Sequence, residues 1–318
     1  MNRFLVLGGT GFVGRAVCER LVERSGGAGG FVRVPTRRLP RGNAIRSLPT
    51  LELVEADVHD EAQLTKLLVG VDAVVHLVAI LHGNRAAFER AHVALPAKLA
   101  RACAAAGVNR VVHISALGVG PGAPSNYLRS KTEGEAVLRG AKLDLTVLRP
   151  SVIFGAEDRF LNVFAQLQVV APVLPLAGSG ARFQPVWIED VASAIVAALD
   201  KPETIGQTYE LAGPRVYTLS ELVRLAGRWS GHERAQVPLP GFAGRLQAMV
   251  MELLPGEPLM SRDNVDSMSV PNVATGTLPT LKALGIEATA LEAVGPGYLG
   301  RDAGRARLER WRAAHRQD

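Results

Sequence analysis

The chain has 318 residues, of which 47% are hydrophobic and 21% are charged, and its formal net charge is +6. A chain of this length and composition can bury a large core, which excludes a mainly disordered protein. The positive charge gathers in residues 33–46 and 301–316, and no basic strand carries interleaved aromatic side chains. The charge therefore does not predict nucleic-acid binding.

Apolar runs alternate with helical patterns through the first half of the chain. Predicted strands cover residues 4–8, 31–35, 51–55, 73–79, 110–115 and 143–149. The helical patterns between them cover residues 14–24, 61–69, 88–106 and 125–139. Continuous Val/Leu/Ile strands separated by helices indicate a parallel sheet that is covered on both faces. Right-handed crossovers then give an α/β fold with a doubly wound Rossmann sheet, and we expect residues 1–150 to form this NAD(P)-binding domain.

After Pro150 the pattern becomes irregular and rich in proline and glycine. Helices are predicted at residues 190–199 and 219–229, with a short apolar stretch at 209–212. We expect residues 151–318 to form a smaller C-terminal lobe packed on the first domain, with a basic tail after residue 300.

A further amphipathic helix is predicted at residues 242–254. Its large apolar residues fall at roughly helical spacing and are Phe242, Leu246, Met249, Val250, Leu253 and Leu254. The favoured interpretation is that they cover the core of the lobe. The alternative is an exposed surface for a partner protein or a lipid interface.

Two absences limit the class of protein. Cys18 and Cys103 lie far apart and in no His/Cys cluster, so neither a disulfide framework nor a metal site is predicted. The chain opens with a strand pattern instead of a signal peptide, and no apolar run reaches the roughly 18 residues of a membrane span. We expect a cytoplasmic protein, with peripheral attachment at the inner face of the membrane left open.

The first strand is followed by Gly8, Gly11 and Gly14 in G-x-x-G-x-x-G spacing. One glycine permits the tight turn, one lets the backbone approach a pyrophosphate, and one lets helix and strand pack closely. The free N–H groups at the start of the next helix favour phosphate there. The turn predicts a dinucleotide site that also includes Thr10, Phe12 and Val13.

The end of the second predicted strand indicates which dinucleotide is bound. An NAD site usually carries Asp or Glu there, whereas this chain has Pro35-Thr36-Arg37-Arg38 and no acid until Glu52. A guanidinium can bind the 2′-phosphate of NADPH in a bidentate way, which a carboxylate would repel. Arg37 is the first choice and Arg38 the second, and two solvated loop arginines are the alternative.

Three further segments are expected to line the cofactor. Asp57, followed by Val58, is predicted either to contact the adenine amino group or to cap the next helix. Residues Leu77, Val78 and Ala79 should pass beside the ribose. Pro150 and Val152, after the sixth strand, complete the predicted set.

Tyr127 and Lys131 lie four residues apart on a predicted helix and so face the same way. A nearby ammonium favours the phenolate, so we expect the pKa of Tyr127 to be lowered. Such a tyrosine can exchange a proton with a carbonyl or alcohol while hydride moves to or from a nicotinamide. Ser115, at the end of the fifth strand, is predicted to hydrogen-bond the substrate oxygen, or alternatively to serve as a strand-end hydroxyl.

Together these residues resemble the short-chain dehydrogenase/reductase superfamily, in its extended or atypical branch related to NAD-dependent sugar epimerases and dehydratases. The resemblance implies a Rossmann fold and the Tyr–Lys chemistry described above. One departure is Ser115-Ala116, where the sugar epimerases usually carry a Ser-Ser or Ser-Thr pair. The segments that carry the resemblance are residues 8–14, 57, 77–79, 127–131, 148–150, 184–192 and 209–213.

One subgroup is similar over nearly the whole chain up to about residue 300, namely the nucleotide-binding accessory subunit of respiratory complex I and its free-standing bacterial relatives. The similar segments are residues 127–131, 153–162 and 259–265, and Glu-Asp-Arg-Phe-Leu-Asn at 157–162 is the most specific. In the mitochondrial complex this subunit holds NADPH tightly in a structural role. The resemblance therefore implies NADPH and leaves catalytic turnover open.

Three functions follow from these patterns. The first is an NADPH-dependent oxidoreductase acting on a small carbonyl or quinone-like molecule. The second is a non-catalytic NADPH-binding subunit or assembly factor of a respiratory complex, docked to that complex or to a membrane surface. The third is a nucleotide-sugar epimerase or dehydratase, for which Arg149 and Arg182 are the available anion-binding residues.

Overall fold

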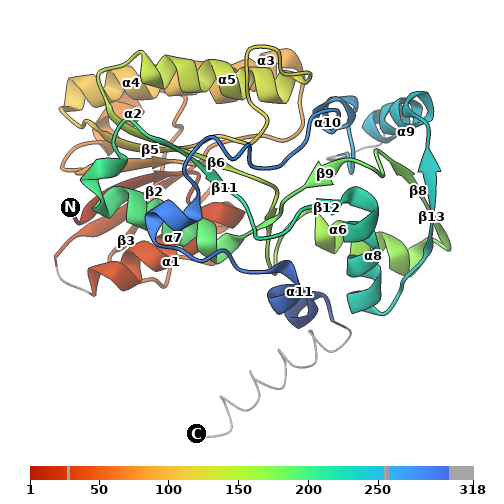
Figure 1. Ribbon diagram of the computed structural model, residues 1–318. Coiled ribbons are helices and arrows are strands. Elements are labelled where there is room, and N and C mark those ends of the chain that lie inside the picture. Colours follow the sequence, from red (N-terminus) through yellow and green to blue (C-terminus); the bar gives the residue numbers. More distant parts are fainter. Residues whose placement is uncertain (27–28, 254–255, 257, 301–318) are drawn as a thin grey trace, which may run out of the picture.

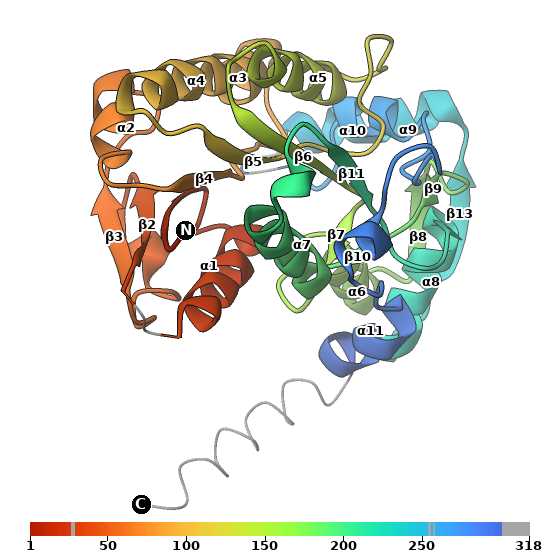
Figure 2. The same ribbon diagram turned by 60° about the vertical axis from the view of Figure 1, so that its left-hand side comes forward.

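A computed structural model describes residues 1–26, 29–253, 256 and 258–300. At its centre is a seven-stranded sheet in the order β11-β6-β5-β4-β1-β2-β3, in which every pairing is parallel (Figures 1 and 2). The order reverses between β1 and β4, which is the Rossmann arrangement and confirms the predicted fold class. The strands are β1 (Arg3–Leu7), β2 (Phe31–Thr36), β3 (Leu51–Glu55), β4 (Ala73–His76), β5 (Arg110–Ile114), β6 (Asp144–Pro150) and β11 (Thr208–Leu211).

Helices cover both faces of this sheet. On one face α1 (Phe12–Ser25) packs beside α7 (Ile188–Asp200), and on the other lie α2 (Glu61–Leu67), α4 (Leu95–Ala106) and α5 (Asn126–Arg139) (Figure 2). Alternate residues of β1 enter the two cores, since Phe4 and Val6 face α1 whereas Leu5 and Leu7 face α4. All four side chains are fully buried, as expected for a central parallel strand.

The chain crosses the expected domain boundary at residue 150 and then returns to the sheet. Strand β11 pairs with β6, and α7 packs on α1 across the same hydrophobic core. The first lobe therefore contains residues 1–150 together with α7 and β11. A helix and a strand that the sequence placed in the second half thus complete the first lobe: α7 covers the sheet, and β11 extends it.

The long helix predicted at residues 88–106 is divided in three. It consists of α3 (Arg85–Glu89), a π-helical turn η2 (Arg90–Ala94) and α4. Pro96 has no N–H, so the carbonyl of His92 loses the α-helical partner it would have four residues later. The π turn places that carbonyl directly against α5, as described below.

The second lobe packs α6 (Leu161–Val170), α8 (Leu219–Ser230) and α11 (Leu291–Leu299) around one apolar cluster. Helix α8 was predicted, and it starts with a capping box formed by Thr218 and Glu221. Of the smaller elements, three are pairs of short strands: β7 (Ile153–Phe154) with β10 (Val186–Trp187), β9 (Arg182–Phe183) with β12 (Tyr217–Thr218), and β8 (Val173–Ala177) with β13 (Ala235–Leu239). The others are α9 (Gly241–Leu253), α10 (Arg262–Ser267) and the 3₁₀ turns η1 (Leu39–Gly42), η3 (Pro202–Thr204) and η4 (Leu281–Leu284).

Helix α9 packs on the lobe through its small residues. Gly244 and Ala248 are its buried positions, and a Cβ atom at Gly244 would lie 2.6 Å from the Cβ of Ala177. The large apolar side chains point outward, with exposed fractions from 40% to 80% for Phe242, Leu246, Met249, Val250 and Leu253. The favoured interpretation that they cover the core is therefore wrong for these five residues. Leu254 and the basic tail at 301–318 lie outside the described residues.

Within the described part of the chain, no helix combines the length and apolar character needed to cross a membrane.

Candidate cofactor and catalytic site

The glycine-rich turn has the geometry that a dinucleotide pyrophosphate requires. Gly8 adopts φ +88°, a left-handed conformation that favours glycine, and its carbonyl accepts from the N–H of Gly11 (3.0 Å). A Cβ atom at Gly14 would lie 2.2 Å from the carbonyl oxygen of Gly8, so the first turn of α1 can pack here only without a side chain. Each predicted glycine thus has a structural reason.

The start of α1 leaves its N–H groups without a side-chain cap. Gly11 is the N-cap, and the first helical residues are Phe12 and Val13. Uncapped N–H groups and the positive end of a helix dipole form a natural phosphate site. The loop after β4 lies on the other side of the turn, since a Cβ atom at Gly8 would meet Leu77 and Val78 at 3.2–3.3 Å. The predicted ribose-side residues and the glycine turn are therefore brought together.

A segment of the second lobe leans against the same turn. A Cβ atom at Gly155 would lie 3.3 Å from the ring of Phe12, and Glu157 forms an ion pair with Arg15 on α1. The buried Asp158 holds the segment in shape, because its carboxylate accepts from the N–H groups of Gly155, Phe160 and Asn162 and from the Tyr298 hydroxyl. The most specific sequence segment thus contains the residue that anchors this contact between lobes.

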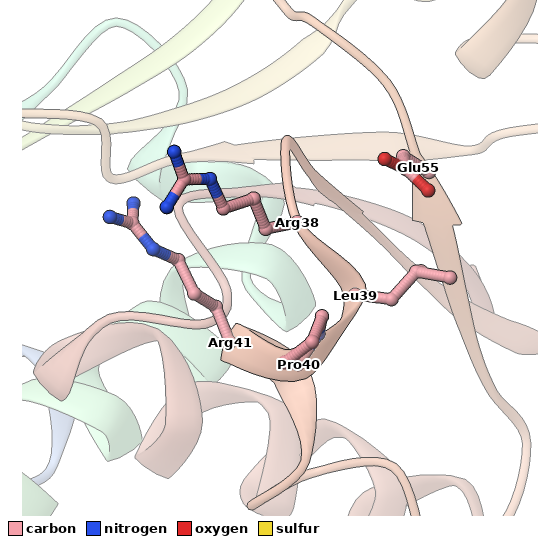
Figure 3. A pocket seen from close by; sticks show the side chains of 5 residues that line it. All are labelled: Arg38, Leu39, Pro40, Arg41 and Glu55. Atoms are coloured by element: carbon pink, nitrogen blue, oxygen red, sulfur yellow. The ribbon is translucent and has the colours of Figure 1, made fainter.

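Beyond β2, an open pocket of about 650 Å³ is lined by Arg38, Leu39, Pro40, Arg41 and Glu55. Figure 3 shows the guanidinium groups of Arg38 and Arg41 gathered on the same side and pointing away from Glu55. The 3₁₀ turn η1 brings the two residues together, because Arg38 is its N-cap and the carbonyl of Arg38 accepts from the N–H of Arg41 (3.1 Å). Gly42 lets this turn pack closely against β3, since a Cβ atom at residue 42 would clash with the side chain of Leu53.

The other predicted adenosine-side residues lie near this pocket but do not line it. Arg37 is exposed. The pKa of His59 is lowered mainly by burial, and the positive charge of Arg37 lowers it further. Asp57 accepts from the N–H of His59 (3.0 Å), while Asp60 caps α2. The alternative role of Asp57 as helix cap is therefore wrong, and its adenine contact stays a prediction, as does any contact from the half-buried Val58.

Sequence reasoning missed Arg41 because its alignment with Arg38 depends on η1.

Tyr127 and Lys131 occupy the first two turns of α5 and face β5. Ser125 caps this helix, and both carboxylate oxygens of Asp263 on α10 accept from the N–H groups of Asn126 and Tyr127 (2.7 and 3.0 Å). The buried Lys131 ammonium donates to the carbonyl of Ile114 at the end of β5 (2.6 Å). The Tyr127 hydroxyl makes no hydrogen bond with any described residue.

Burial sets the protonation of this pair. It raises the pKa of the Tyr127 phenol to about 12, opposite to the lowering expected from the neighbouring ammonium. It also lowers the pKa of Lys131 to about 8, against the smaller raising effect of the Glu135 charge. The phenol is therefore protonated near neutral pH, which suits a proton donor.

Ser115 lies beside this pair, and its hydroxyl is buried next to Glu135 of α5. Its Oγ has no accessible surface and no hydrogen-bond partner of good geometry in the described chain, although it helps to lower the pKa of the nearby Glu135 carboxyl. Glu135 is itself held by Arg149 in a bidentate pair (2.8 and 2.6 Å). Ala116, the next residue, packs in the apolar cluster that includes Tyr127, whereas Ser115 does not. This arrangement favours the interpretation of Ser115 as a strand-end hydroxyl.

The residues after β6 connect the lobes. The carbonyl of Pro150 accepts from Leu117, and the N–H of Val152 donates to the side chain of Asn272 (2.8 Å). Ala79 is exposed in the loop after β4. These positions are compatible with the predicted cofactor contacts, which remain predictions.

Comparison with known proteins places the whole sheet in one family. A model of the NAD dependent epimerase/dehydratase family matches residues 4–212, from β1 to β11. The chain belongs to this family. Membership in the epimerase/dehydratase family agrees with the glycine turn, the reversal of strand order and the expected class of dinucleotide cofactor, NAD(P).

Curated relatives extend the match beyond the sheet. The chain is 33% identical over 294 residues to NADH dehydrogenase (ubiquinone) 1 alpha subcomplex subunit 9, mitochondrial, of Mus musculus, covering 90% of this chain and 77% of the mouse protein. It is 30% identical over 238 residues to the ceramide reductase of Caulobacter vibrioides, covering 74% and 73% of the two chains. Both of the resemblances found in the sequence, to the superfamily branch and to the complex I subgroup, are confirmed.

A solved structure shares the fold. MoeE5 in complex with UDP-glucose and NAD superposes with a TM-score of 0.70 at 19% identity, over 96% of this chain and 99% of the other. At this identity the likeness concerns the architecture alone.

Proposed function

We propose that this protein is an NADPH-dependent reductase of a hydrophobic carbonyl or quinone-like molecule. The observation that carries the proposal is the geometry of the pair on α5: Tyr127 lies one helical turn before Lys131, and the Lys131 ammonium is held at the end of β5 by the carbonyl of Ile114. This pair lies at the carboxyl end of β5, near the reversal of strand order where α/β sheets bind their ligands. A protonated phenol can donate its proton to a carbonyl oxygen during reduction.

The surroundings of Tyr127 favour an apolar substrate. Ala116, Ala123 and Leu128 form a buried cluster there, with Val119 and Val270 packed against it. Arg149, one of the two anion-binding candidates, is engaged by Glu135 and does not offer its charge to a diphosphate. These contacts support a hydrophobic carbonyl over a nucleotide sugar, and the ceramide reductase among the relatives acts on a lipid by its name.

In the proposed reaction the chain supplies position and a proton. The glycine turn and the start of α1 hold the pyrophosphate, and Lys131 holds the ribose hydroxyls beside Ile114. Bound NADPH supplies the hydride for the carbonyl carbon. Tyr127 donates its phenolic proton to the carbonyl oxygen, which becomes the alcohol, and the phenolate then takes a proton from solvent.

The direct test of this function is oxidation of NADPH by candidate substrates. The purified protein is incubated with NADPH, and absorbance near 340 nm is followed after addition of long-chain aldehydes, ketones or quinones. Substrate-dependent loss of absorbance with formation of the alcohol supports the proposal. Bound NADPH that is oxidised by none of these classes contradicts it.

We also propose that Arg38 and Arg41 select NADPH over NADH. Replacing both with alanine should weaken NADPH binding roughly 10- to 100-fold, because a charged hydrogen bond to phosphate contributes about 1.5–3 kcal/mol. NADH affinity should not change, since it lacks the 2′-phosphate. Fluorescence titration with both cofactors measures this difference.

The matched control is Arg37→Ala, which removes the sequence's first choice from the same loop. If Arg37→Ala alone abolishes the preference for NADPH, Arg37 and not the η1 pair reads the phosphate. Equal affinities for NADPH and NADH in the unmodified protein would contradict the cofactor choice altogether.

A second candidate function is a binding subunit that holds NADPH without turnover and docks to a respiratory complex or membrane surface. It is supported by the outward apolar side chains of α9 and by the mitochondrial complex I subunit among the relatives. Replacing Leu246 with Glu should then move the protein from the sedimented membrane fraction to the supernatant. Stability should change little, because Leu246 is 55% exposed.

The control for this surface is Val69→Glu, at a residue of similar exposure just after α2. It should leave the distribution between fractions unchanged. If the native chain and the Leu246→Glu variant partition alike, α9 is not a docking surface.

A further inference from the structure

His92, in the π-helical turn η2, contacts both the loop that faces the dinucleotide turn and the helix that carries the Tyr–Lys pair. The N–H of Ile80 donates to its Nε2 (3.0 Å), and its Nδ1 lies 2.8 Å from the Oγ of Ser130. The side chain is 2% exposed. His92 thus joins two segments that are about 50 residues apart in sequence and meet across one edge of the sheet.

The hydrogen-bond network leaves a single arrangement of protons. Because Nε2 accepts from Ile80, a neutral His92 carries its proton on Nδ1 and donates it to Ser130. The Ser130 hydroxyl can then donate its own proton to the carbonyl of Tyr127 (2.8 Å). Every donor in this chain of bonds faces an acceptor, so the chain runs in one direction from Ile80 to Tyr127.

The backbone of the π turn is locked onto the same face of α5. A Cβ atom at Gly134 would lie 1.9 Å from the carbonyl oxygen of His92, so the turn reaches α5 only because residue 134 is glycine. This carbonyl is the one that Pro96 deprives of its α-helical partner. Ser130 and Gly134 are one helical turn apart, and together they fix the side chain and the main chain of His92.

The ring of His92 also supports the phenol directly. It packs edge-on against Tyr127 with ring centroids 5.5 Å apart and an angle of 82°, and Phe88 completes the group at 5.6 Å from His92 and 6.2 Å from Tyr127. On its other side, the loop that carries Ile80 begins with Leu77 and Val78, which contact the glycine turn. Tyr127 and the cofactor turn are therefore linked through one imidazole.

We propose that His92 is a positioning residue that sets the phenol of Tyr127 against the bound nicotinamide. The proposal rests on the proposed reductase function and adds to it a residue outside the Tyr–Lys pair. Because His92 acts on Tyr127 and on the loop beside the cofactor, its loss should lower kcat far more than it raises KM or weakens NADPH binding. Misplacing a reacting group by about 1 Å can cost about 10²-fold in rate.

Two variants separate the hydrogen bonds from the bulk of the ring. His92→Phe keeps an aromatic ring against Tyr127 but neither accepts from Ile80 nor donates to Ser130. His92→Gln retains one acceptor and one donor. We expect kcat to fall about 10²-fold in His92→Phe and to recover largely in His92→Gln. NADPH binding stoichiometry, measured on each variant, shows the fraction of correctly folded sites.

Amide hydrogen exchange tests the link without any turnover. Exchange in residues 77–84 should be faster in His92→Phe than in the native chain and should return to the native rate in His92→Gln. If exchange is the same in all three proteins, or if His92→Phe turns over at the native rate, the proposal is overturned. If the native protein reduces no carbonyl, the reductase function fails, while the exchange measurement still decides whether His92 ties the loop to α5.

Discussion

Replacing Tyr127 with Phe should lower carbonyl reduction by about 10³-fold while NADPH remains bound, because general acid catalysis typically contributes 10²- to 10⁴-fold. Phenylalanine preserves the ring that packs against Ala116 and His92 and removes the only atom proposed to donate a proton. The Tyr127 hydroxyl bonds to no described residue, so its loss leaves no buried partner unsatisfied. Single-turnover loss of NADPH absorbance measures the effect on the chemical step.

Tyr209→Phe is the matched control. Tyr209 is 6% exposed and lies on β11, in the core between the sheet and the α1–α7 layer, so its phenol is remote from the proposed reaction. Turnover should stay at the native level in this variant. Native turnover in Tyr127→Phe would remove Tyr127 from the chemistry and leave the binding-subunit function as the stronger candidate.

The parts of the site that the sequence predicted correctly depend on local spacing. Gly8, Gly11 and Gly14 follow a strand and precede a helix, and the packing that each permits is local to that turn. Tyr127 and Lys131 share a helix face because of the α-helical period alone. Neither prediction required knowledge of distant contacts, and the structure brings both features to the edge of the sheet where the parallel strands end.

The parts that sequence reasoning missed depend on local departures from regular structure. Arg38 and Arg41 are brought together by a 3₁₀ turn. The sequence alone does not show this turn, so only the adjacent residues Arg37 and Arg38 were considered. His92 appeared to belong to one continuous helix, and only the π turn before Pro96 aims it at α5. Pro96 was a visible signal for this irregularity, since proline inside a helical pattern removes a hydrogen bond.

Two side-chain directions show the limits of hydrophobic patterning. Side chains along a strand alternate between its two faces, so Ser115 points to the same face as His113, toward α5. This alternation explains why Ser115 is buried beside Glu135. In α9 the pattern of large apolar residues marked the wrong face as buried. Close packing on β8 requires small residues, and Gly244 and Ala248 supply them.

Stability should fall steeply when the pH drops below about 6.5, because three histidines are buried in neutral form on the α4–α5 side of the sheet. Burial, followed by the charge of Lys131, lowers the pKa of His76 to about 3 and that of His92 to about 3. The same two causes hold the pKa of His113 well below its ordinary value. The Nδ1 atoms of His76 and His113 lie 2.8 Å apart, so one neutral ring donates its Nδ1 proton to the other.

The sign follows from comparing folded and unfolded chains. An unfolded histidine takes up a proton near pH 6.5, whereas these three remain neutral when folded. Their contribution is fully present above pH 6.5 and is lost as the pH falls toward 3, because the unfolded state then binds more protons. The slope approaches about 4 kcal/mol per pH unit for three groups at about 1.4 kcal/mol each. Carboxylates with lowered pKa add to the loss only below about pH 4.5, and Lys131, with a pKa of about 8, titrates mainly above this window.

Urea unfolding followed by circular dichroism at pH 7.5, 6.5, 5.5 and 5.0 measures this effect. The free energy of unfolding should be about 4 kcal/mol lower at pH 5.5 than at pH 7.5, a large part of the roughly 5–15 kcal/mol typical of a domain. His92→Gln retains a donor and an acceptor but cannot titrate, so it should reduce the slope by about one third relative to the native chain. Equal unfolding midpoints at pH 7.5 and 5.5 would mean that the imidazoles take up protons without leaving the core. In that case Lys131 would share its burial with a second cation, and the neutral, one-directional hydrogen-bond chain through His92 could not persist.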